Sequence, residues 1–112
     1  MAKSYPRHER IADVVLRELA IFLQRETNDP RLQEVSITAV KVSPDKSRAR
    51  VFFNIFEKSS AKEVEGVLNK ASGYFRTLLA KSSGLRYTPS LHFEYDASIL
   101  YAADLSRLIN DT

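Results

Sequence analysis

The residues of this chain most able to do chemistry are basic, and they gather in one stretch. Residues 66–93 contain no aspartate or glutamate, but they contain Lys70, Arg76, Lys81 and Arg86. Cations in a stretch without carboxylates are free to bind phosphate oxygens. The stretch therefore predicts an anion-binding surface, with nucleic acid as the natural ligand.

A helical break lies within the same stretch, at Ala71-Ser72-Gly73. An apolar stripe with spacings of three and four residues runs from Val64 to Leu79 and stays in phase across Gly73. Glycine inside a helix costs about 1 kcal/mol relative to alanine. We therefore predict two half-helices that meet at a kink, where free N–H groups favour an anion. Ser72 and Gly73 would let a phosphate backbone approach closely.

Two interpretations of this helix remain open from the residues alone. On a straight helix Lys70, Tyr74, Thr77 and Lys81 share one flank. The two cations would then hold phosphates while Tyr74 offers a ring or a hydroxyl. A solvated flank, with a glycine that serves packing only, explains the same residues equally well.

Four further arginines extend the candidate surface. Arg48 and Arg50 alternate outward on a predicted strand, and solvation alone would also explain them. Arg10 shares a face of the first helix with Arg17, and Asp13 lies between them. The Asp13–Arg17 spacing is that of an ordinary intrahelical ion pair, which is the favoured explanation. Arg7 lies near the start of that helix. The full set of candidate RNA contacts is Arg7, Arg10, Arg48, Arg50, Lys70, Ser72, Gly73, Arg76, Lys81 and Arg86.

Patterns typical of enzymes are missing from the sequence. It has no phosphate loop, no nucleophile elbow, no paired metal-ligand spacing and no cysteine. His8 and His92 fall on separate predicted elements, with no nucleophile beside either. Glu94 and Asp96 share a strand face, where charges usually keep a sheet soluble. We expect neither catalysis nor a cofactor.

Length and composition indicate one soluble globular domain over residues 1–112. The chain is 44% hydrophobic and 28% charged, which is ordinary for such a fold. No apolar run approaches the roughly 20 residues of a membrane span. The opening MAKSYPRHER lacks the apolar core of a signal peptide. We therefore expect a cytoplasmic protein with no membrane contact.

The predicted elements alternate in a way typical of an α+β fold. Ser60-Ala-Lys-Glu63 has the form of a capping box, and a change of phase indicates a bulge between Ala39 and Val40. Outward Phe52 and Phe56 are unusual on the second strand. Helices packed on one face of a three-stranded sheet satisfy the pattern. The predicted bounds are a helix over 6–26, a hairpin of strands over 35–43 and 48–56, a helix from 60 to about 82 that is broken at 71–73, a strand over 91–96 and a short helix over 98–109.

The chain resembles the bacterial ribosome-binding factor A family over nearly its whole length. No single fragment is decisive, but their order and spacing together are specific. The matching fragments are Arg7-x-x-Arg10-Ile11, Asp29-Pro30-Arg31-Leu32, Ser36-Ile37-Thr38-Ala39-Val40 with Val42-Ser43, Asp45 with Ala49-Arg50-Val51, Leu68-x-x-Ala71-x-Gly73-x-x-Arg76, Leu85-Arg86-x-x-Pro89-x-Leu91-x-Phe93, and Tyr95-Asp96.

This resemblance implies a KH-like domain of the second topological type, α-β-β-α-kink-α-β. KH domains clamp single strands with a GxxG loop, which is absent from this sequence. The family carries the kink instead, here Ala71-Ser72-Gly73. We therefore expect contact with RNA backbone and shape rather than ordinary base reading.

The resemblance also implies a non-enzymatic assembly factor. Such a factor binds the small (30S) ribosomal subunit, assists late 16S rRNA processing and supports growth in the cold. A ribosome-associated GTPase that promotes release is a further expected partner. We also expect the protein to be a monomer. The alternative is a KH-like protein–protein adaptor with incidental basic charge, suggested by Phe52, Phe56 and the missing GxxG.

Overall fold

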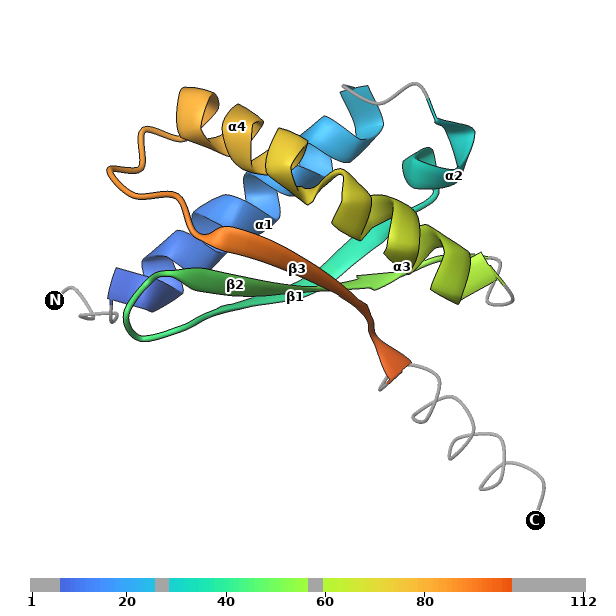
Figure 1. Ribbon diagram of the computed structural model, residues 1–112, viewed down its shortest axis with the longest axis horizontal. Helices are drawn as coiled ribbons and strands as arrows, with labels where there is room; N and C mark the ends of the chain where they lie inside the picture. Colours follow the sequence, from blue (N-terminus) through green and yellow to red (C-terminus); the bar gives the residue numbers. More distant parts are fainter. Residues whose placement is uncertain (1–6, 26–28, 57–59, 98–112) are drawn as a thin grey trace, which may run out of the picture.

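A computed structural model describes residues 7–25, 29–56 and 60–97 and places three helices over one face of a three-stranded sheet (Figure 1). The covering helices are α1 (Arg7–Arg25), α3 (Ala61–Lys70) and α4 (Ser72–Ser82). The strands are β1 (Ser36–Val42), β2 (Arg48–Asn54) and β3 (Ser90–Tyr95). The other face of the sheet carries no helix among these elements.

The sheet is mixed, because its strands are joined in two different ways. A short turn joins β1 to β2 as an antiparallel hairpin, as the sequence predicts. The α3–α4 crossover then returns the chain, so that β3 lies parallel to β2 in the order β1-β2-β3. This crossover brings the end of α4 and the loop before β3 to the end of the sheet that carries the hairpin turn.

The core forms between the sheet and the three helices, and it contains the residues of the predicted stripe. Val64, Leu68, Phe75 and Leu79 are almost fully buried. The ring of Phe75 lies 5.8 Å from that of Phe93 on β3, centre to centre. Both half-helices therefore pack on one core, as the unbroken phase predicts.

The predicted interruption falls where α3 ends and α4 begins. Ala71 lies between the two helices with φ −91° and ψ 5°, and its N–H donates to carbonyl oxygens of the preceding turn. Gly73 is the second residue of α4, and a β carbon added there would meet nothing within 4 Å. Packing therefore does not require glycine at this position.

The predicted position of the bulge and the predicted capping box both differ from the structure. The register of β1 shifts between Ile37 and Ala39 rather than between Ala39 and Val40. Ser60 precedes α3 but makes no side-chain capping hydrogen bond. Glu63 does not complete a capping box, and its carboxylate instead forms an ion pair with Arg31.

Element ends differ from the prediction by one or two residues, and one element was missed. The second strand ends at Asn54, so Phe56 lies beyond it. A four-residue helix, α2 (Pro30–Gln33), follows α1, with Asp29 accepting from the N–H of Arg31 at its start. The helix predicted over 98–109 lies outside the described residues.

The outer edge of β3 is protected by two side chains of α3. The amide of Asn69 accepts from the Phe93 N–H at 2.8 Å and donates to the Phe93 carbonyl at 2.9 Å. Glu65 accepts from the Tyr95 N–H at 2.9 Å. These bonds replace a further strand and fix α3 against the sheet.

Candidate nucleic-acid interface

The loop between α4 and β3 (residues 83–89) is held firmly at both of its ends. Gly84 has φ 72°, which favours glycine, and it follows the helix end at Ser83. Arg76 reaches from α4 and donates from Nε and Nη2 to the Thr88 carbonyl at 3.1 and 3.0 Å. Pro89 is fully buried. The loop is thus fixed, and its exposed residues lie between these anchors.

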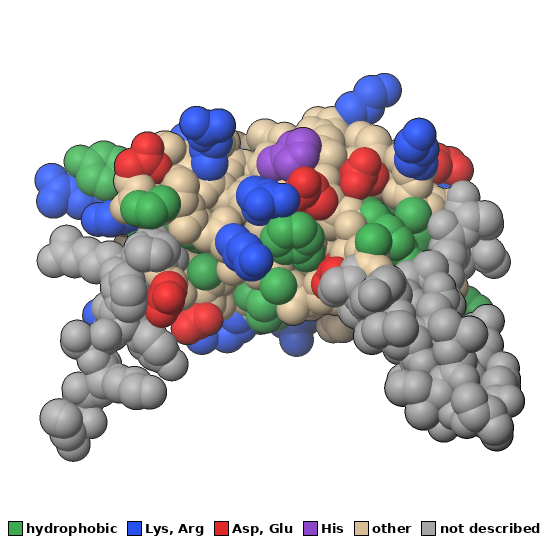
Figure 2. All heavy atoms as spheres, turned by 90° about the horizontal axis from the view of Figure 1, so that it is seen from below, with side chains coloured by type: hydrophobic (Ala, Val, Ile, Leu, Met, Phe, Trp, Pro, Cys, Tyr) green, Lys and Arg blue, Asp and Glu red, His purple; other side chains and the backbone are tan. Residues whose placement is uncertain are grey.

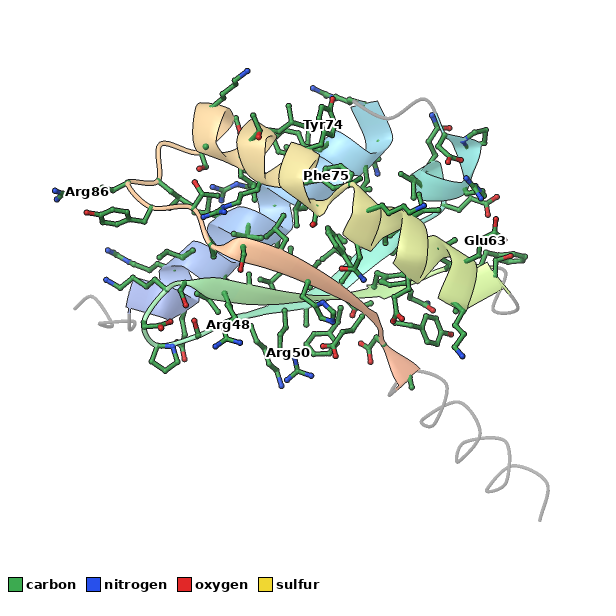
Figure 3. All side chains as sticks on the ribbon, in the orientation of Figure 1. Arg48, Arg50, Glu63, Tyr74, Phe75 and Arg86 are labelled. Carbon is green, nitrogen blue, oxygen red and sulfur yellow. The ribbon has the colours of Figure 1, made fainter. Side chains whose placement is uncertain are left out.

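Arg86 and Tyr87 are the exposed residues at the tip of this loop. Figure 3 shows Arg86 pointing outward from the molecule at the end of the sheet that carries the hairpin turn. Tyr87 is 68% exposed, and the Arg86 guanidinium carbon lies 5.5 Å from the centre of its ring. Both side chains are therefore available to a ligand.

Two shallow hollows lie on either side of this pair of residues. One, of about 540 Å³, is lined by Arg76 and Lys81 of α4 together with Arg86 and Tyr87. The other, of about 420 Å³, is lined by Arg10 of α1 together with Arg86 and Tyr87 and by Lys46 of the hairpin turn. The loop tip thus separates two basic depressions.

Lys46, in the hairpin turn, is a further cation that lines the second hollow. It is not among the RNA contacts predicted from the sequence. Its φ of 64° places it in a tight turn, where its N–H donates to the Ser43 carbonyl at 2.8 Å. Hydrogen bonds from the Ser43 hydroxyl and then from Ser47 lower the pKa of Asp45 to about 2. The ionised carboxylate therefore holds the turn in shape. The turn residues are evident in the sequence, but their approach to the loop is not.

We call Arg10, Lys46, Arg76, Lys81 and Arg86 the basic cluster. None of the five forms an ion pair with another residue in the described part of the chain. Arg76 donates hydrogen bonds to the Thr88 carbonyl. The other four side chains form no side-chain hydrogen bond within the described residues. Uncompensated cations on one surface attract anions such as phosphates.

Arg48 and Arg50 lie elsewhere, on the open face of the sheet. Both point away from the helices (Figure 3), and Figure 2 shows basic, acidic and apolar side chains intermingled on this face. Arg50 Nε donates to Glu94 Oε2 at 2.8 Å, and this bond lowers the pKa of Glu94. Phe52 lies between Arg50 and Lys41, at 5.1 and 5.7 Å from its ring centre. Here the positive charge is partly neutralised and partly used in packing.

The remaining predicted contacts are spread along α3 and α4. Lys70, Ser72 and Gly73 lie at the kink, roughly 12 to 16 Å along the helices from Lys81. Thr77 donates its hydroxyl to the Gly73 carbonyl at 3.0 Å, so it is engaged within the helix. The side chain of Arg7 lies outside the described residues. The structure therefore brings four of the predicted cations to the basic cluster: Arg10, Arg76, Lys81 and Arg86. The other described candidates lie outside this cluster.

The described residues contain no group of three histidine or acidic side chains able to hold a metal ion. In the same part of the chain, none of the helices is long and apolar enough to cross a membrane.

Comparison with known proteins assigns the chain to a family. The model of the family described as ribosome-binding factor A matches residues 7–109. The chain belongs to the ribosome-binding factor A family. It is 48% identical to the ribosome-binding factor A of Coxiella burnetii over 92% of this chain and 87% of that protein.

Solved structures of ribosome-binding factor A share the fold. The crystal structure from Thermus thermophilus has a TM-score of 0.64 at 27% identity, covering 79% of this chain and 94% of that one. A Thermus thermophilus homology model fitted into the cryo-EM map of a 30S complex has a TM-score of 0.62 at 28% identity, covering 75% and 89%. The KH-like α+β fold implied by the resemblance is thereby confirmed.

Proposed function

We propose that this ribosome-binding factor A family member binds the small (30S) ribosomal subunit and assists late 16S rRNA maturation without catalysis. Supporting this, a homology model of a relative was fitted into a map of its complex with the 30S subunit. The single observation that carries the proposal is the basic cluster, whose cations face solvent around a fixed loop.

The contacts proposed are to RNA backbone and shape. The sequence has no GxxG loop to clamp four nucleotides, whereas cations from separate elements meet at the basic cluster. Ser72 and Gly73 are small residues at the start of α4, where RNA backbone could approach closely. They would extend the contact towards Lys70. Arg48 and Arg50 take a smaller part, because Glu94 already pairs with Arg50.

Co-sedimentation with purified small subunits tests the binding. The variant Lys81→Glu/Arg86→Glu should be lost from the subunit peak at a salt concentration where the wild-type chain remains bound. Arg48→Glu/Arg50→Glu carries the same change of charge and is the matched control. Equal retention of both variants would overturn the assignment of the site.

Ribosome profiles of cells grown in the cold test the maturation role. Cells without the protein should accumulate free small subunits with precursor 16S ends, and the wild-type gene should restore the profile. A normal profile would favour the adaptor hypothesis, whose best remaining support is Phe56, 91% exposed beyond the end of β2.

We further propose that the chain acts as a monomer in the cytoplasm, where ribosomes assemble, and leaves the subunit with the help of a ribosome-associated GTPase. Light scattering of the free chain should give the monomer mass. Adding such a GTPase with GTP should move the chain from the subunit peak to the free fraction, and continued binding would refute this route of release.

A further inference from the structure

We infer that Tyr87 stacks on an unpaired RNA base while the cations on either side of it hold the neighbouring phosphates. The inference rests on the proposed function and specifies the form of RNA that the basic cluster recognises, which is a single strand.

The position of Tyr87 is the main observation behind this inference. It is the one aromatic residue that borders both basic hollows in the described chain, with Arg10 and Lys46 on one side and Arg76 and Lys81 on the other. A strand crossing the loop tip would place a base at this ring and phosphates in both hollows. Single-strand binders combine a basic groove with aromatic side chains in this way.

The rigidity of the loop makes the ring ready to bind. Arg76 holds the carbonyl of Thr88, the next residue, and Pro89 is buried. The Arg86 guanidinium lies 5.5 Å from the ring centre. A ring whose backbone is anchored before binding loses less conformational freedom when a base stacks on it.

The fold itself gives Tyr87 no burial to explain its presence. It is 68% exposed, whereas Tyr95 packs against the core and the Phe53 ring at 5.8 Å. In a duplex the base faces are already stacked on one another, so an exposed ring gains nothing from double-stranded RNA. The ring therefore points to an unpaired nucleotide.

Tyr74 provides a comparison within the same molecule. It is also exposed, at 52%, but it borders neither basic hollow, and its ring lies 5.8 Å from that of Phe75. An exposed aromatic that borders neither basic hollow lacks the phosphate contacts of the Tyr87 site. Tyr74→Ala is therefore the matched control.

Fluorescence anisotropy with a labelled oligouridylate, and with an abasic oligomer of equal length, tests the inference. The wild-type chain should bind the base-bearing oligomer about tenfold more tightly than the abasic one. Tyr87→Ala should abolish that difference, whereas Tyr87→Phe and Tyr74→Ala should keep it. The salt dependence should stay unchanged in Tyr87→Ala, because no phosphate contact is lost.

Two outcomes would overturn the inference. One is equal binding of both oligomers by the wild-type chain, and the other is a Tyr87→Ala variant that keeps the preference for bases. Neither outcome would contradict the proposed function if Lys81→Glu/Arg86→Glu still abolishes binding to small subunits. The proposed function would be contradicted instead by unchanged subunit binding in that charge-reversed variant.

Discussion

The basic cluster and the open face of the sheet both carry arginines, yet they offer very different surfaces. In the basic cluster, cations from α1, the hairpin turn, α4 and the following loop meet without a carboxylate partner in the described chain. On the open face, Arg50 is bound to Glu94 and lies over the Phe52 ring. The difference shows that a count of cations does not give the positive charge available to a ligand, because neighbouring side chains neutralise part of it.

The largest effect should separate these two regions directly. Lys81→Gln/Arg86→Gln should weaken binding to small subunits by about 10- to 100-fold, which corresponds to about 1.4–2.7 kcal/mol for the two exposed charge contacts together. The salt slope of log K should become shallower by about 1.4 for single-stranded contacts or about 1.8 for duplex contacts. Titrations at several salt concentrations measure both.

The matched variant Arg48→Gln/Arg50→Gln removes the same charge from the open face. Its affinity and salt slope should change less than those of Lys81→Gln/Arg86→Gln. If this variant loses as much affinity as Lys81→Gln/Arg86→Gln, the contrast between the two regions is wrong.

Arg76→Ala should be the next largest change, because it frees the loop that positions the basic cluster. We expect about tenfold weaker subunit binding and a decrease of about 1 kcal/mol in the free energy of unfolding. Hydrogen exchange of the backbone amides of residues 84–88 should speed up. Lys81→Ala, on the same helix, should leave these amides protected; equal exchange in the two variants would show that Arg76 does not hold the loop.

Gly73→Ala should separate folding from binding at the kink. The added β carbon meets nothing within 4 Å, so the free energy of unfolding should rise by about 0.5–1 kcal/mol. Subunit affinity should fall a few-fold, because the methyl group covers backbone proposed to approach RNA. Thermal melts and binding titrations test both changes, and unaltered affinity would remove Gly73 from the interface.

The smallest effect concerns the ion pair on the open face. The Arg50 guanidinium lowers the pKa of Glu94, so the stabilisation from the pair is present above the ordinary glutamate pKa. It is lost as the pH falls through the lowered value. NMR titration should show the Glu94 pKa returning towards its ordinary value in Arg50→Gln. An unchanged Glu94 pKa would mean that Arg50 is not neutralised on this face.

Element types could be predicted because they depend on local periodicity. The stripe from Val64 to Leu79 predicts both half-helices, and the alternation along β2 predicts its buried face, where Ala49, Val51 and Phe53 are fully buried. The capping box failed for a different reason. Ser60 and Glu63 have the correct spacing, but Arg31, 32 residues away, competes for the Glu63 carboxylate.

Much of the candidate site could be predicted as well, since Arg76, Lys81 and Arg86 are conspicuous in a stretch without acids. Lys46 could not, because its own surroundings are those of an ordinary turn with Asp45 beside it. Nor does the sequence show that Arg76 binds a carbonyl 12 residues later, or that Glu94 pairs with an arginine 44 residues earlier.

The order of elements, the faces that they bury, the supply of basic side chains and the family all follow from the amino-acid sequence alone. Which cations meet, and which are neutralised, depends on the three-dimensional arrangement of the elements. Burial follows from a residue's position on its own helix or strand, whereas an electrostatic site depends on distances of a few ångströms between elements. The crossover that sets β3 parallel to β2 creates those distances, and it brings Arg86 to Arg10 and Lys46.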